Sequence, residues 1–408
     1  MSQSWSLVLI AGIAVLSSLA VSALKRLGRG RVAVPAAVVE IALGMVVGPG
    51  VLAWVWDSEV LDVLAHAGLA ALIFLTGFGV GTDVTAVGGN ALRRAGWSWL
   101  VALALGLGAG VLLRGGRFGE GAMVGVALTT TGLGLGLGLG LGLGSAALPA
   151  RCGRLREAAV SGAAAGVTGP VVALAVMVGG AVGASIAAVT VATVVWAMRP
   201  RGAVRAREGR GREIDGPTAV RWVVLPLAAM VWVSQVAGLD VLLGAFAIGV
   251  AARRVLGADP VLPRTIEAIG YGFLVPFLYV VTGVDIDLGA LGGSLRSLAL
   301  VPLFVLLFLV VRGGPVALFA PRGLRVRERA VLALDAATAL PLVVVVTTLA
   351  LSDDRMTPGA AAALVVAGLV SVVVFPLSAG RRDCPADEGS SGTTAEPAAP
   401  ARSPYGCG

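Results

Sequence analysis

The sequence predicts an all-α polytopic membrane protein with about 13 transmembrane helices, since each span takes about 20 predominantly apolar residues. Of its 408 residues, 57% are hydrophobic and only 13% are charged, whereas a soluble domain carries about a quarter charged residues. The mean hydropathy is +0.93. A chain of this length could not bury so much apolar surface in one soluble core, so the bilayer is the expected solvent.

Apolar stretches long enough for spans follow one another along most of the chain. We expect them at residues 5–24, 32–51, 61–80, 95–113, 121–143, 158–178, 181–198, 222–237, 241–252, 265–284, 298–311, 330–351 and 360–377. Residues 1–380 therefore form one transmembrane domain. Residues 381–408 are rich in Pro, Gly, Ser and Ala, which predicts a disordered cytoplasmic tail.

Basic residues divide unevenly between the loops of this arrangement. With the N-terminus outside, 27 of the 31 Lys and Arg residues fall in cytoplasmic loops or the tail, and the others are Arg114, Arg117, Arg296 and Arg355. Because cytoplasmic loops are enriched in Lys and Arg, we expect an inner-membrane protein with its N-terminus outside and its C-terminus cytoplasmic. The basic residues that give the net charge of +8 then contact anionic lipid, and the charge does not indicate nucleic-acid binding.

Enzymatic, metal and cofactor chemistry find no support in the sequence. It has three cysteines and one histidine, without a CxxC pair or a His/Cys cluster of the kind that binds zinc. Seven glycines alternate with six leucines from Gly132 to Gly144, but no Lys-Ser/Thr follows, as a phosphate loop requires. This run is either a low-complexity expansion or a deliberately weak, broken helix.

Three carboxylates lie within the predicted spans, where charges are costly and usually functional. Glu40 could pack or gate a helix contact or act on an ion, because Gly44 and Gly48 share its helix face and small residues allow close approach. Glu267 could pair with Arg264 at the inner interface, and Asp335 could pair with Arg329 or serve the transport path. No lysine or arginine is expected near the centre of a span.

Two predicted spans carry signals of interruption. Thr130 and Thr131 precede Gly132 and the glycine run, and Thr338 precedes Pro341 seven spans later. Proline disturbs a helix, and interrupted spans at corresponding places in two halves are typical of a transporter's binding site. The candidate ion-binding residues are therefore Thr130, Thr131, Asp335, Thr338 and Glu267, and the candidate helix-break and packing residues are Gly132, Pro341, Glu40, Gly44 and Gly48.

Several motifs resemble those of the monovalent cation:proton antiporter family, of the sodium/proton exchanger type. Pro35, Glu40, Gly44 and Gly48-Pro49 are similar to its P-x4-E-x3-G-x3-GP pattern. The stretches LGAFAIG (243–249), IEAIGYGF (266–273) and AATALPL (336–342) resemble further family motifs in the same order. The resemblance implies inverted five-helix repeats, broken helices 5 and 12 that cross, a homodimer, and alternating access that exchanges a monovalent cation (Na+ or K+) for protons.

The family also implies an acidic residue in the sixth helix, and this sequence departs there. The matching stretch runs from Gly162 to Pro170, and Val167 occupies the place of the acid. Such exchangers use one buried carboxylate that binds either a cation or a proton, and valine can bind neither. The first hypothesis is a cation:proton antiporter in which Asp335 or Glu267 has taken over. The alternative is a transporter-fold protein that has lost antiport, such as a sensor, a partner subunit or a degenerate copy.

Overall fold

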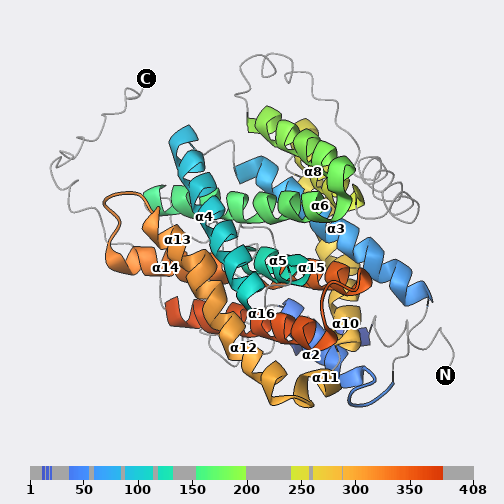
Figure 1. Ribbon diagram of the computed structural model, residues 1–408. Coiled ribbons are helices and arrows are strands. Elements are labelled where there is room, and N and C mark those ends of the chain that lie inside the picture. The colour runs from blue at the N-terminus through green and yellow to red at the C-terminus, as the bar shows by residue number, and fades with distance from the viewer. Residues whose placement is uncertain are drawn as a thin grey trace, which may run out of the picture.

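The computed structural model describes residues 12–13, 15–17, 19–20, 36–54, 59–83, 88–113, 118–131, 153–198, 240–256, 261–286 and 288–379. Every regular element within these ranges is a helix (Figure 1), which confirms the all-α class. The expected span at 222–237, the glycine–leucine run after Gly132, most of the first span and the tail at 381–408 lie outside the described residues.

The helices follow one another in two groups along the chain. The first group is α2 (Ala36–Val47), α3 (Glu59–Asp83), α4 (Gly89–Leu113), α5 (Phe118–Leu128), α6 (Gly153–Met198) and α8 (Asp240–Leu256). The second is α9 (Val261–Ile269), the π-helical turn η4 (Gly270–Leu274), α10 (Val275–Asp285), α11 (Leu288–Gly292), α12 (Leu295–Leu307), the π-helical turn η5 (Phe308–Gly313), α13 (Gly314–Leu318), α14 (Val326–Ala337), α15 (Leu340–Ser352) and α16 (Pro358–Ala379).

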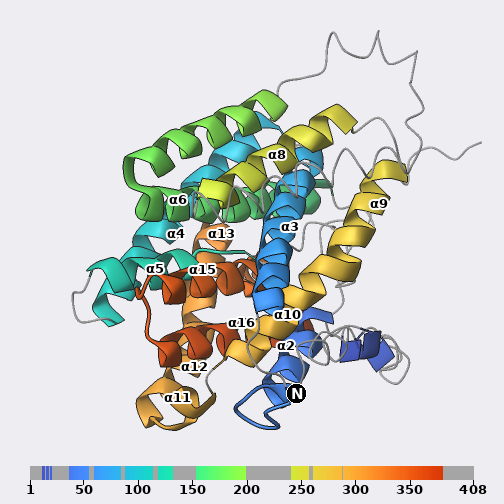
Figure 2. The ribbon, with the colours of Figure 1, turned by 90° about the vertical axis from the view of Figure 1, so that its right-hand side faces the viewer.

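Membrane-length segments account for most of the described chain. Seven helical segments are long and apolar enough to cross a bilayer, and three shorter apolar helices accompany them. Each of these ten coincides with a span expected from the sequence. The long α6 covers two expected spans, because it breaks at Gly180, whose φ of 57° is a conformation that glycine adopts without steric cost. Its two parts fold back on each other (Figure 2).

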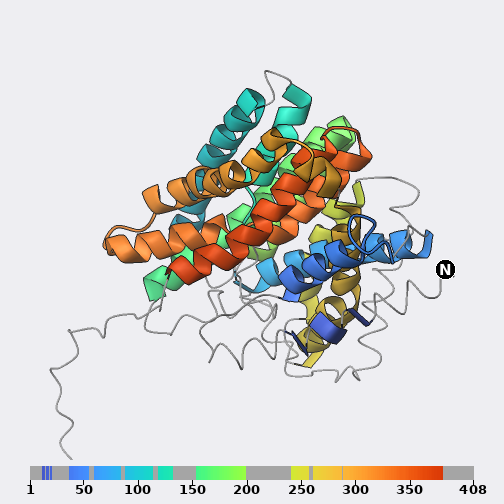
Figure 3. The same ribbon diagram turned by 90° about the horizontal axis from the view of Figure 1, so that it is seen from below.

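The two groups of helices pack into layers around a shared centre. In the layer coloured orange to red, α12 and α14 pack against α16 (Figure 3). On the other side α3 packs against α8 and α10, and α10 packs against α2. Between them, α5 and α15 lie side by side (Figures 1 and 2). These two helices come from different halves of the chain, and each of them borders a break that lies inside the protein.

Glycines bring the backbones of neighbouring helices into contact. A Cβ atom at Gly44 of α2 would collide with the Val280 carbonyl of α10, and one at Gly283 would collide with the Ile41 carbonyl. On α4 and α5, Gly106 faces Gly125 with the same closeness. Membrane helices associate through such small residues because lipid provides no hydrophobic drive between them.

Replacing Gly44 with Ala tests this packing. The new methyl group must push α2 from α10, so we expect a lower apparent melting temperature in detergent and a loss of about 1–3 kcal/mol of stability, as for overpacked cores. Gly108→Ala on α4 is the matched control, since no atom lies within 4 Å of a Cβ there and alanine favours the helix. Equal melting temperatures of the two variants would contradict the close contact.

Candidate functional site

The helix α5 ends inside the protein. It stops at Leu128, and Thr129, Thr130 and Thr131 follow in non-helical conformation, all buried. The hydroxyl of Thr130 donates to the Ala127 carbonyl at 2.7 Å, and the Thr131 amide donates to the Gly166 carbonyl of α6 at 3.1 Å. The last turn of α5 is therefore completed by its own threonines, and Thr131 beyond it is held by α6.

A second interruption separates α14 from α15. Thr338 has an extended backbone (φ −68°, ψ 128°), and its hydroxyl donates to the Asp335 carbonyl at 2.7 Å. Pro341 stands in the first turn of α15, where the amide it lacks would have no intrahelical partner. Because α15 packs against α5, the two interrupted helices meet.

Arg312 lies fully buried beside these breaks, with 0% of its surface exposed. Its Nε donates to Thr131 Oγ1 at 2.6 Å, and its Nη2 donates to the Gly162 carbonyl at 2.5 Å. The side chain thus joins the second half of the chain to the end of α5 and to α6. A Cβ at Gly166 would collide with both Thr131 and Arg312, so glycine is needed where these groups meet.

Arg312 lies in the π-helical turn η5. The amide of Gly314 donates to the Leu309 carbonyl, five residues back. Pro315 comes next and has no amide to donate. Such π-bulges are frequent at functional sites.

Arg312 was expected in the loop after the span at 298–311, and this placement was wrong. The span expected at 298–311 runs from Leu295 to Leu318 in the structure, with Arg312 inside it. The sequence held a signal for this, since 14 residues are too few to cross a bilayer, which takes about 20. Without Arg312, 26 of the 31 basic residues still fall in the loops and tail that the sequence predicts to be cytoplasmic.

The predicted acids occupy three different surroundings. Asp335 is half-buried on α14, three residues before Thr338. Glu267 is half-buried on α9, which packs mainly with η4 and α8 and not beside the breaks. Glu40 is 5% exposed, and its Oε1 accepts a hydrogen bond from Ser17 Oγ at 3.1 Å.

The remaining candidates are divided between the centre and its surroundings. Thr130, Thr131, Thr338 and Pro341 lie at the two breaks, whereas Gly44 and Gly48 lie in the contact between α2 and α10. Gly132 is outside the described residues. Within the described ranges, no three His, Cys, Asp or Glu side chains gather in a way that could hold a metal ion.

Val167 is buried in α6 with 0% exposure, one residue after Gly166. From residue 158 to residue 198 this segment has no Asp or Glu at all. The centre therefore combines a buried guanidinium, threonine hydroxyls and the ends of interrupted helices, without a carboxylate from α6.

Replacing Thr131 with Val tests the bond to Arg312. A guanidinium N–H would stay buried without its acceptor, and we expect a loss of about 1–3 kcal/mol of stability, measured as a lower melting temperature of the purified protein. Thr130→Val is the matched control, because that hydroxyl bonds only within its own turn. Equal melting temperatures would show that the Arg312–Thr131 bond adds nothing to stability.

Interrupted helices that meet among buried polar groups, in a bundle of membrane-length helices, define a secondary membrane transporter. The family model "Sodium/hydrogen exchanger, transmembrane" matches residues 12–381. The chain belongs to this family, which consists of transporters and not of enzymes.

A curated relative and a solved structure agree with the family. The "Putative Na(+)/H(+) antiporter YjbQ" of Bacillus subtilis (strain 168) is 33% identical over 101 residues, which cover 25% of this chain and 16% of that protein. The structure of the sodium proton antiporter MjNhaP1 from Methanocaldococcus jannaschii at pH 8 superposes with a TM-score of 0.59 over 93% of this chain and 99% of that one, at 16% identity. This likeness shows a common fold.

Proposed function

We propose that this protein exchanges a monovalent cation, Na+ or K+, for protons across the membrane by alternating access. The observation that carries the proposal is the meeting of two interrupted helices, α5 and α14–α15, inside a sodium/hydrogen exchanger fold. The relative from Bacillus subtilis and the archaeal protein of the same fold are both named as sodium/proton antiporters, which supports it.

The interrupted helices supply a field that suits a cation. The last carbonyls of a helix have no intrahelical partners, and they carry the negative end of the helix dipole. Both α5 and α14 end inside the protein, near Thr131 and Thr338. Threonine hydroxyls there donate to the Ala127 and Asp335 carbonyls, and the negative end of each helix dipole still attracts a cation. Carbonyl and hydroxyl oxygens there can replace part of the water around a monovalent cation.

Exchange also needs a group that binds either the cation or a proton, and we assign this role to Asp335. Its position on α14, one helical turn before the break at Thr338, brings a carboxylate to the region where α14 ends. Glu267 belongs to a helix that packs elsewhere. Alternating access would then move the Asp335 carboxylate and the helix ends together between the two sides of the membrane.

Replacing Asp335 with Asn should abolish exchange. The amide keeps the shape of the side chain but cannot exchange a proton for a cation. Protein in liposomes under a pH gradient, with an internal pH dye, should show no collapse of the gradient when Na+, K+ or Li+ is added. Glu267→Gln is the comparison variant and should retain exchange. Loss in Glu267→Gln together with normal exchange in Asp335→Asn would transfer the role to Glu267.

A second candidate function is a transporter-fold protein without antiport, acting as a sensor or partner subunit. The observation that favours it is the buried Val167, which stands where the family places an acid. Without a carboxylate in α6, the centre loses one group able to alternate between a cation and a proton.

Replacing Val167 with Glu separates the two candidates. If the protein has simply lost exchange, the wild type gives a flat trace in the liposome assay and Val167→Glu gains cation-dependent collapse of the pH gradient. Val167→Gln, of similar size but without a charge to titrate, is the matched control and should stay flat. Absence of a gain in folded Val167→Glu protein would contradict simple loss.

We further propose how the protein sits in its membrane. The excess of basic residues on one side supports a cytoplasmic-membrane protein with its N-terminus outside and its C-terminus inside. Residues 1–380 would form the transport domain, and 381–408 a disordered cytoplasmic tail. The family resemblance supports a homodimer.

A further inference from the structure

Arg312 has a donor group without a partner. Its Nε and Nη2 are bonded to Thr131 Oγ1 and the Gly162 carbonyl, but its Nη1 is buried and has no hydrogen-bond partner. Both acceptors are neutral. A buried donor of this kind calls for an explanation, and a bound water or ion is the common one.

The charge of Arg312 is not balanced by a carboxylate among the residues that the structure describes. Within the described part of the chain, Arg312 forms no ion pair, and its contacts are the two hydrogen bonds to neutral oxygens. The helices around it carry few carboxylates. There are none in α4, α12 or α13, Glu120 and Glu157 lie near the starts of α5 and α6, and α14 has Glu328 and Asp335. Buried charges in proteins are normally paired, so this one lacks its usual compensation.

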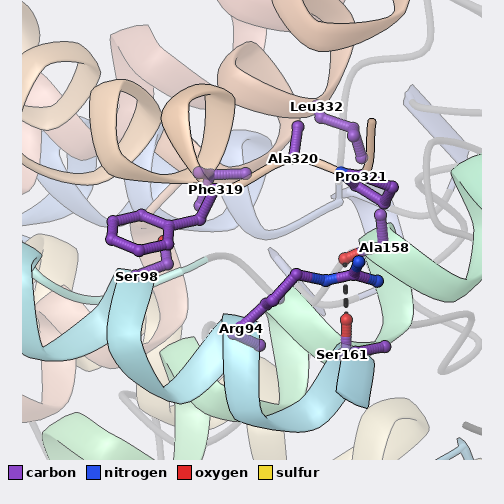
Figure 4. Close-up of a pocket in the computed structure, with 12 residues that line it drawn as sticks. Arg94, Ser98, Ala158, Ser161, Phe319, Ala320, Pro321 and Leu332 are labelled. Carbon is purple, nitrogen blue, oxygen red and sulfur yellow. Dashed lines mark hydrogen bonds between the residues drawn. The ribbon is translucent and has the colours of Figure 1, made fainter. Parts of the chain in front are cut away.

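A hollow adjoins Gly162, the residue of α6 that Arg312 contacts. It lies between α4, α6, α13 and α14 and is half open, with about 330 Å³ of empty space when the open side is counted. Arg94 of α4 points into it beside Ser161 and Ala158 (Figure 4). Gly162, whose carbonyl accepts the bond from Arg312, also lines this hollow, and a Cβ built on Gly162 would meet no atom within 4 Å.

The lining of the hollow favours negative charge. The described lining of the hollow includes the charged residue Arg94 and no Asp or Glu. Ser98 also lines it, and the Ser98 Oγ is buried without a hydrogen-bond partner. Arg312 itself is not part of the lining, but it is bonded to the carbonyl of Gly162, which is.

We propose that Arg312 binds a small monovalent inorganic anion of the halide class, which reaches it from this hollow. The anion accepts a hydrogen bond from Arg312 Nη1 and neutralises its charge, which no carboxylate of α6 does in this chain. A compact monovalent anion matches a single free guanidinium donor, whereas a phosphate would require more donors. The proposal goes beyond cation/proton exchange and does not depend on it, because binding is measured without a gradient.

Chloride binding to the purified full-length protein tests the site. Radioactive chloride should bind saturably in a scintillation proximity assay, and chloride should raise the melting temperature relative to gluconate at constant Na+ and constant ionic strength. Arg312→Gln should weaken binding by about tenfold or more, the loss expected for a hydrogen bond to a charged group. Arg296→Gln, on the first turn of α12, is the control and should bind as the wild type does.

A matched pair at Gly162 locates the anion independently of Arg312. Gly162→Asp places a carboxylate in the hollow and should abolish chloride binding, whereas Gly162→Asn has nearly the same size and should retain it. This pair decides the matter if Arg312→Gln fails to fold. Absence of saturable chloride binding in folded wild-type protein would overturn the proposal, and so would equal binding by the Asp and Asn variants or full binding by Arg312→Gln.

Discussion

The centre of this molecule depends on how the end of α5 is satisfied inside the protein. A helix that stops within a membrane leaves carbonyls without partners, and lipid offers nothing to replace water there. Here the Thr129 and Thr130 hydroxyls donate to the last carbonyls of α5. The Thr131 amide then donates to the Gly166 carbonyl, and the Thr131 hydroxyl accepts a bond from Arg312. Because Arg312 also holds the Gly162 carbonyl, one side chain from the second half of the chain fixes both α5 and α6.

Close contacts at glycines form a tightly packed frame of helices around the two interrupted helices. Gly106 and Gly125 let α4 approach α5 backbone to backbone, and Gly44 and Gly283 do the same for α2 and α10. Contacts of this closeness gain dispersion energy along whole helices. The frame can therefore hold α5 and α15 in place although neither continues through the centre as a regular helix.

The charge at the centre separates this chain from the pattern expected of its family. Val167 occupies the place of an acid in α6, while Arg312 keeps a full positive charge in the interior. A cation would then rely on carbonyls at the ends of α5 and α14 and on Asp335. A small anion beside Arg312 would remove the repulsion that its charge exerts on such a cation. The proposed cation path and the proposed anion site are in this sense physically compatible.

The sequence by itself determined the all-α membrane class, the sites of most spans and the two interruptions. These follow from local properties, because apolar length decides insertion and Thr338 with Pro341 disturbs a helix wherever it lies. It also predicts that Val167 replaces an acid of the family pattern, since that prediction needs only a motif. The tertiary structure alone decided that Arg312 is central, because its burial depends on η5 turning it toward Thr131 and Gly162, which are 181 and 150 residues away in the chain. The tertiary structure also distinguished the positions of Asp335 and Glu267. The sequence places both acids in spans, but helix packing decides which of these spans lies beside the breaks.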